Sequence, residues 1–184
     1  MKPLMRLCLL APTLAACTGP ELPDDIAAAL GDFDDPSGWG AGCDDIRLAR
    51  SSEDRTLGLI VYLNRPLQSR TTPPEEEERV EYDFGSPDIG TNTAMLLLGE
   101  RVLGHFCDDG ISEEDEPDID ARWSLTGGQG TLTIRAEDRP AEFNDARVDF
   151  VLEDAEFTPE DPDEEVVTMG TLRWTGAHVG WLPG

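Results

Sequence analysis

The chain is poor in positive charge. Its single lysine is Lys2, and 14 Lys and Arg residues stand against 39 Asp and Glu residues, which gives a net charge of −25. A field of this sign repels nucleic acid and anionic lipid headgroups, so we expect no nucleic-acid partner. The same field attracts cations and basic proteins, although a carboxylate-rich surface also simply keeps a protein hydrated and dispersed.

Signatures of catalysis and of metal binding are also scarce. The two histidines, His105 and His178, are far apart in the sequence, and neither a G-x-S-x-G nor a C-x-x-C motif is present. We therefore predict that the protein is not an enzyme and holds no metal or other cofactor. Two alternatives stay open: paired carboxylates for hydrolysis, and calcium at the acid-rich segment 108–120, whose spacing is not that of an EF-hand.

No apolar run is long enough for a permanent transmembrane helix, but the N-terminus carries a shorter one. Two basic residues precede an apolar run at 7–14, which ends in small residues before Cys17. This order is typical of a secretory signal. Roughly 10 apolar residues, interrupted by Pro12, cannot cross about 30 Å of hydrocarbon. We predict that residues 1–16 are a signal peptide, and their removal would make the net charge −27 because Lys2 and Arg6 leave with them.

The end of this segment, Leu14-Ala15-Ala16-Cys17, resembles the lipobox of bacterial lipoprotein precursors. The resemblance implies that Cys17 is lipidated and becomes the mature N-terminus, so that the membrane is a partner through the lipid. Thr18, which follows where an Asp would signal retention, implies release to the outer membrane. We therefore expect a lipid-anchored protein of the bacterial outer membrane or cell surface. An ordinary secretory signal with an incidental cysteine is the alternative.

Cys43 and Cys107 are the cysteines that remain once Cys8 leaves with the signal and Cys17 takes the lipid. In an exported protein two remaining thiols most often pair, so we predict a Cys43–Cys107 disulfide. Closing a loop of this length constrains the unfolded chain by about 4 kcal/mol in the chain-entropy model.

The mature chain divides into a tether and one domain. Residues 17–42 are rich in Gly, Pro and Asp and predict a tether, in which only 26–30 can form a helical turn or two. Residues 43–184 carry short apolar or alternating runs separated by turn residues. These runs predict strands at 45–50, 56–63, 79–84, 93–98, 102–107, 121–125, 129–136, 146–157 and 166–174.

Three details refine these strands. The run 56–63 is apolar on both faces, which indicates a central, fully covered strand. The sequence "TGGQG" at 126–130 predicts a hairpin turn, and a slip in the alternation near Glu153 predicts a β-bulge. Trp123 and Trp174 lie on apolar phases and are expected in the core.

Eight or nine short strands without a long helix predict an antiparallel β-sandwich behind a flexible tether. In its acidic, all-β character the domain loosely resembles bacterial envelope lipoproteins of uncharacterised function, and this likeness implies no site residues. Our first hypothesis is a non-catalytic binding or organising role at the cell surface, with an envelope protein or a glycan as partner and an unknown ligand. The alternatives are an envelope hydrolase that uses carboxylates or a bound cation, and a purely structural surface lipoprotein.

Overall fold

A computed structural model describes residues 22–30, 46–64, 77–104, 116–135 and 146–179. The prediction of an all-β, mostly antiparallel domain is confirmed, because the described residues form eight strands and a single turn of helix. The elements are α1 (Ile26–Ala29), β1 (Ile46–Ser51), β2 (Leu57–Leu63), β3 (Glu78–Asp83), β4 (Thr93–Glu100), β5 (Asp118–Ile134), β6 (Ala146–Pro159), β7 (Val167–Met169) and β8 (Leu172–Val179).

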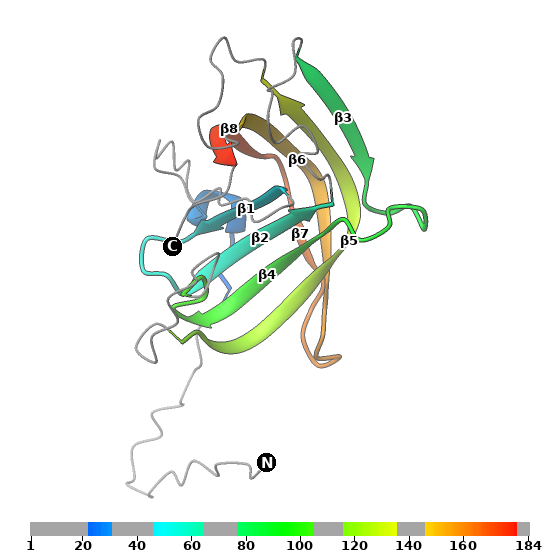
Figure 1. The fold of residues 1–184 in the computed structure, drawn as a ribbon. Helices are drawn as coiled ribbons and strands as arrows, with labels where there is room; N and C mark the ends of the chain where they lie inside the picture. Colours follow the sequence, from blue (N-terminus) through cyan, green and yellow to red (C-terminus); the bar gives the residue numbers. More distant parts are fainter. Residues whose placement is uncertain (1–21, 31–45, 65–76, 105–115, 136–145, 180–184) are drawn as a thin grey trace, which may run out of the picture.

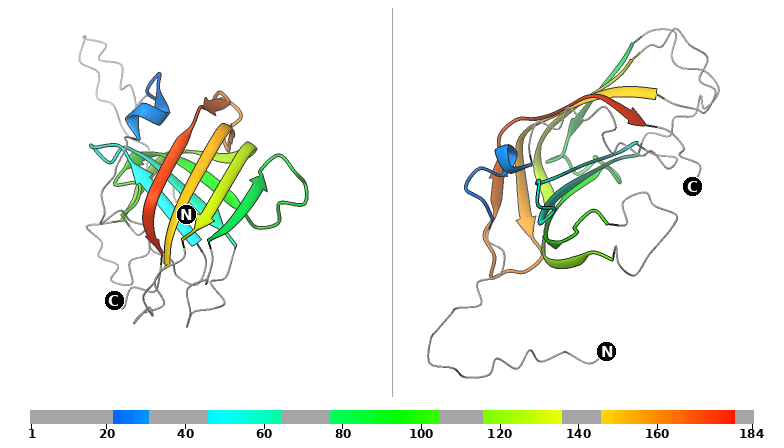
Figure 2. Two further views of the ribbon diagram at one scale, coloured as in Figure 1. Left: turned by 90° about the horizontal axis from the view of Figure 1, so that it is seen from above. Right: turned by 90° about the vertical axis from the view of Figure 1, so that its left-hand side faces the viewer.

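The β-sandwich is not confirmed, because the strands belong to one hydrogen-bonded sheet rather than two. Its order is β1-β2-β4-β5-β6-β7, with β3 paired to β5 and β8 paired to β6. The sheet curls on itself into a nearly closed, barrel-like shape (Figures 1 and 2). Closing a sheet in this way leaves one interior, which holds the main core.

The predicted hairpin at 126–130 is wrong. A single continuous strand lies there and links strands of one sheet, where the sandwich needed two sheets. β5 runs through this segment as one strand and changes neighbour there: its first half pairs with β4 and its second half with β3. The glycines serve close approach instead of a turn. A Cβ on Gly128 (φ +117°) would lie 2.9 Å from the Ala155 Cα, and one on Gly130 would lie 2.7 Å from the Phe84 ring.

The predicted bulge near Glu153 is confirmed. The pairing of β5 with β6 shifts register twice, once on each side of Gly127. The second shift lies between the Gly127–Glu156 pair and the Gln129–Glu153 pair, where β6 has an extra residue. Asp154, inside this interval, has a positive φ of 50°. β6 also changes its other neighbour here, from β8 to β7. Bulges increase the local twist of a strand, so β5 and β6 bend together at the same level.

The interior is filled by side chains from every part of the sheet. Trp123 is 1% exposed and Trp174 is 6% exposed, so both lie in the core as predicted. The segment assigned to the tether also contributes, because α1 and the residue after it bury Ile26 and Leu30 in this core. The side chain of Asp25 accepts a hydrogen bond from the Ala28 amide at 3.0 Å and caps the helical turn.

Side chains join β1 to β8 at the seam where the sheet nearly closes. The Trp174 indole Nε1 donates to the Ala49 carbonyl at 3.3 Å. The buried Arg50 lies over the Trp174 ring, 5.1 Å from its centre, and donates to the Arg173 carbonyl. These contacts tie β1, the first strand in the order, to β8, which pairs with β6.

Two further strand predictions need correction. Residues 102–104, the first half of the predicted strand 102–107, form a turn, and 105–107 lie outside the described residues. The predicted strand 166–174 is two strands, because β7 ends at Met169 and β8 begins at Leu172. No helical segment in the described ranges has the length and apolar character needed to span a bilayer.

Candidate binding site

The predicted lipidation site and disulfide cannot be placed in the fold. Cys17, Cys43 and Cys107 all lie outside the described residues. The described residues do contain a site that the sequence analysis did not identify. It is an apolar pocket on the outward face of β1, β2 and β4, called the outer pocket below.

The outer pocket arises because β2 and β4 are apolar on both faces. Their inward residues, such as Leu59 and Leu96, are fully buried in the main core. Since side chains alternate along a strand, their neighbours point the other way. Ile60 and Leu97 are 9% and 6% exposed and form a second apolar cluster, separate from the main core. The members of this cluster are Ala49, Ile60, Leu97 and Val102, flanked by Tyr62, Met95, Leu103 and Ile119.

The turn after β4 covers part of this face. The Val102 amide donates to the Arg55 carbonyl at 3.3 Å, which fastens the turn to the β1–β2 connection. A Cβ on Gly58 would lie 2.6 Å from a Val102 methyl group, so the absence of a side chain at Gly58 allows the turn to rest on β2. Leu103 packs beside it at the edge of the cluster.

What the turn leaves uncovered is a pocket of about 220 Å³. Ile60 and Tyr62 of β2 form its apolar wall together with Met95 and Leu97 of β4. Residues 102, 103, 117 and 119 close its sides. An engineered apolar cavity of about 150 Å³ accepts benzene, so the outer pocket can hold one ring or a short alkyl chain.

Two arginines, Arg47 and Arg122, line the outer pocket. Arg47 of β1 lies over the Tyr62 ring, with its Cζ 4.9 Å from the ring centre. Its Nε is buried and has no hydrogen-bond partner in the part of the chain that the structure describes. Arg122 of β5 is the second arginine of the lining and is exposed. Apolar surface beside positively charged hydrogen-bond donors suits a ligand that carries both an apolar part and an anionic part.

An acidic hollow of about 620 Å³ adjoins the outer pocket and shares Ile119 and Arg122 with it. Its acidic residues are Asp120, Glu160, Asp161 and Glu164. Across the described ranges, no three His, Cys, Asp or Glu side chains gather in a way that would hold a metal ion. The hollow is therefore an acidic surface.

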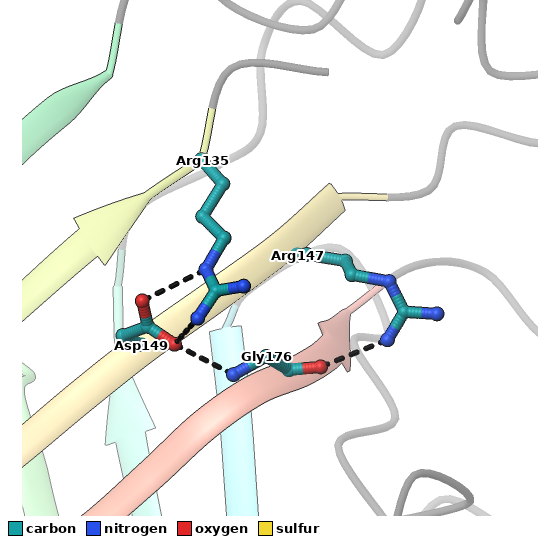
Figure 3. A network of polar contacts seen from close by, with 4 residues as sticks. All are labelled: Arg135, Arg147, Asp149 and Gly176. Atoms are coloured by element: carbon teal, nitrogen blue, oxygen red, sulfur yellow. Dashed lines mark hydrogen bonds and ion pairs between the residues drawn. The ribbon is translucent and has the colours of Figure 1, made fainter. Parts of the chain in front are cut away.

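Away from the outer pocket, a polar network links the residue that follows β5 to β6 and β8 (Figure 3). Asp149 accepts from Arg135 through Nε at 2.8 Å and through a terminal nitrogen at 2.6 Å, and it also accepts from the Gly176 amide at 2.6 Å. Arg147 donates to the Gly176 carbonyl at 2.9 Å. The hydrogen bond from Arg135 to Asp149 raises the pKa of Arg135 above its usual value. The β6–β8 register shifts between Val148 and Phe150, so this network holds the strands together at an irregularity.

Sequence reasoning missed the outer pocket for a definite reason. The run 56–63 was correctly interpreted as apolar on both faces, and 93–98 has the same character. A sandwich covers only one face of each sheet, so two adjacent strands of this kind already imply apolar outward surface. That signal was present, but Arg47 and Arg122 could not be assigned to the same surface without the strand order.

Comparison of the chain with protein-family models, with curated proteins and with solved structures finds no match.

Proposed function

We propose that the mature chain is a lipid-anchored protein of the bacterial envelope that binds a ligand in the outer pocket and catalyses no reaction. The lipobox supports the anchor at Cys17 and an outer-membrane or cell-surface location. One observation carries the binding role: an open apolar pocket on the outward face of a strongly acidic protein. In the described ranges Val166 is the only large hydrophobic residue that is exposed, and the apolar residues of the outer pocket are buried or half-buried. A concave site lined mainly by apolar side chains, with a few polar groups beside them, is the usual form of a small-molecule site.

The size of the outer pocket limits what it binds. Pockets for whole drug-sized ligands measure about 300–1,000 Å³, and about 220 Å³ is smaller than that range. The pocket therefore receives an apolar portion of a ligand, and the remainder of the ligand lies at the protein surface. A purely structural surface lipoprotein is the competing proposal, and it predicts no saturable binding.

Titration with 1-hexanol tests the binding role, because this alcohol is neutral, soluble and small enough for the pocket. We expect saturable binding by calorimetry, with a dissociation constant on the order of millimolar for one short buried chain. The full chain carrying Cys17→Ser avoids lipid and detergent, and every pocket variant is compared in that same background.

Two tryptophan substitutions separate pocket binding from non-specific partitioning. Met95→Trp places a larger ring in the pocket wall and should abolish the binding of 1-hexanol. Thr131→Trp adds the same ring to the outward face of β5, remote from the pocket residues, and should leave the binding unchanged. Binding that survives Met95→Trp, or no saturable binding to either chain, would contradict the proposed role of the pocket.

Metabolic labelling with a fatty-acid analogue tests the anchor separately. The wild-type chain should take up the label, whereas Cys17→Ser should lose it and accumulate as precursor. A mature, unlabelled, water-soluble wild-type protein would refute the lipoprotein proposal and leave the binding role to be judged by the titrations.

A further inference from the structure

We infer that the ligand of the outer pocket is a single-chain organic acid, in which an apolar chain or ring lies in the pocket and a carboxylate binds Arg47 and Arg122. The inference rests on the proposed function and goes further by assigning the charge of the ligand. Its starting point is that two arginines line one small apolar pocket in a chain of net charge −25.

The two arginines have donors available for a ligand. In the described part of the chain, neither Arg47 nor Arg122 forms an ion pair or a side-chain hydrogen bond, and the buried Nε of Arg47 lacks an acceptor. Arg79 and Arg135, by contrast, are paired with Glu81 and Asp149. A guanidinium carries five N–H donors in a planar fork that matches the two oxygens of a carboxylate.

The strands that form the wall of the pocket differ from the acidic hollow beside it, because their outward residues within the described chain include no acid around the pocket. The outward residues of β1, β2 and β4 between positions 47 and 97 are Arg, Ala, Ser, Gly, Ile, Tyr, Thr, Met and Leu, with no Asp or Glu among them. The outward residues of β3 include Glu81 and Asp83, and those of β6 include Asp149 and Glu156. A carboxylate that approaches Arg47 thus meets no like charge among the outward residues of these strands between positions 47 and 97; Glu100 lies at the end of β4.

Charged groups within the pocket affect a bound ligand more than the net charge of the protein does. Exposed charges more than about 8 Å apart are largely screened at physiological ionic strength, so the distant carboxylates contribute little at the pocket. A single carboxylate in the pocket meets Arg47 and Arg122, and the nearest acids are those of the hollow beside Arg122. An extended anionic surface such as a bilayer would instead face the whole acidic protein, which is why we assign a free small acid rather than a membrane surface.

The acidic hollow beside Arg122 supports the opposite assignment, a cationic ligand, and the experiment must separate the two. Hexanoate, 1-hexanol and hexylammonium share one alkyl chain and differ in the charge of the head group. Calorimetry with the Cys17→Ser chain at neutral pH and about 0.15 M salt compares their affinities under equal screening. We expect hexanoate to bind about fivefold to tenfold more tightly than 1-hexanol, as one charge-assisted contact supplies, and hexylammonium to bind more weakly than both.

Substitutions at Arg47 and Arg122 test whether these side chains cause the preference for hexanoate. Arg47→Met keeps an unbranched side chain over Tyr62 and should reduce the affinity for hexanoate to that for 1-hexanol, whose own affinity stays unchanged. Arg122→Gln should reduce the preference for hexanoate in part. Arg79→Met, on the outward face of β3, is the matched control and should alter none of the three affinities. Added NaCl should lower the preference for hexanoate and leave the binding of 1-hexanol in place.

The outcomes distinguish this inference from the function on which it rests. Equal binding of hexanoate and 1-hexanol, or a preference for hexanoate that survives Arg47→Met, would overturn the assigned carboxylate and leave an apolar pocket. Tighter binding of hexylammonium would overturn it in favour of the acidic hollow. Absence of saturable binding for all three compounds would overturn both the inference and the proposed function.

Discussion

Replacing Trp174 with phenylalanine should loosen the seam between β1 and β8. The indole is 6% exposed and packs against Phe150, with ring centres 5.6 Å apart. Its Nε1 donates to the Ala49 carbonyl at 3.3 Å, and Arg50 lies over its face. Phenylalanine keeps an aromatic ring at this position but has no N–H, so Trp174→Phe removes the donor that joins the two strands.

The loss of stability can be worked out from these contacts. Leaving the buried Ala49 carbonyl without its donor costs about 1–2 kcal/mol. The smaller ring leaves roughly 40 Å³ unfilled, which costs about 1 kcal/mol at the measured rate for core cavities. Phenylalanine also attracts a cation less strongly than tryptophan, so the contact with Arg50 loses a few tenths of a kcal/mol. Together these terms give about 2–3 kcal/mol, or a melting temperature lower by about 4–12 °C.

Trp123→Phe is the matched control. Trp123 is 1% exposed and its Nε1 donates to a backbone carbonyl, that of Glu165, at 3.0 Å. The global destabilisation should therefore be similar. Hydrogen exchange separates the two variants, because only Trp174→Phe should speed the exchange of the β1 amides (Ile46–Ser51). Trp123→Phe should speed exchange around 160–166 instead. Unchanged β1 protection in Trp174→Phe, at a stability loss of the expected size, would refute the role of the indole in the seam.

Three further predictions concern a bulge, a turn and the cysteines. Gly99→Ala should destabilise the domain severely in thermal unfolding, because a Cβ there would lie 2.0 Å from the Asp118 carbonyl oxygen, whereas Gly90→Ala, with nothing within 4 Å, should cost only about 1 kcal/mol. Hydrogen bonds from Ser52 and Thr56 lower the pKa of Asp54, so the small stability that Asp54 adds over Asp54→Ala should be present above its unfolded pKa near 3.8 and vanish as pH falls through the lower folded pKa. Intact-mass analysis of envelope extracts should show two protons gained on reduction as Cys43 and Cys107 separate, and two free thiols in oxidised extracts would contradict the disulfide.

Local sequence patterns predicted the strands well where each strand kept one environment. β2 and β4 were predicted from their apolar runs, and β3 from its alternation, to within a residue or two. β5 was split in error because glycines at 127–130 are a strong turn signal when only the local sequence is considered. Their role depends on Ala155, Glu153 and Phe84, which approach the glycine backbone closely only in the folded sheet. No local pattern contains that information.

The candidate site was harder to predict because it combines residues from separate strands. Arg47 and Arg122 belong to β1 and β5, which are not neighbours in the sheet, since β2 and β4 lie between them. Their joint position on one pocket follows from the strand order and from the alternation within each strand. A mistaken hairpin in β5 changes the order and separates them. An error at three glycines was therefore enough to conceal the site.

The architecture explains why an apolar outward surface is informative in this protein. In a domain with a second layer of helices, outward apolar residues on a strand are expected, because the helices cover them. The described chain has eight strands in one sheet and a single helical turn, whose buried residues Ile26 and Leu30 join the main core. The turn at 101–104 covers Ile60 and Leu97 but leaves a pocket between the strands and the two arginines. Because burial of those two residues is already achieved by the turn, stability alone does not require the pocket to stay open beside Arg47 and Arg122, and the acid that we propose as ligand would account for both the space and the charge.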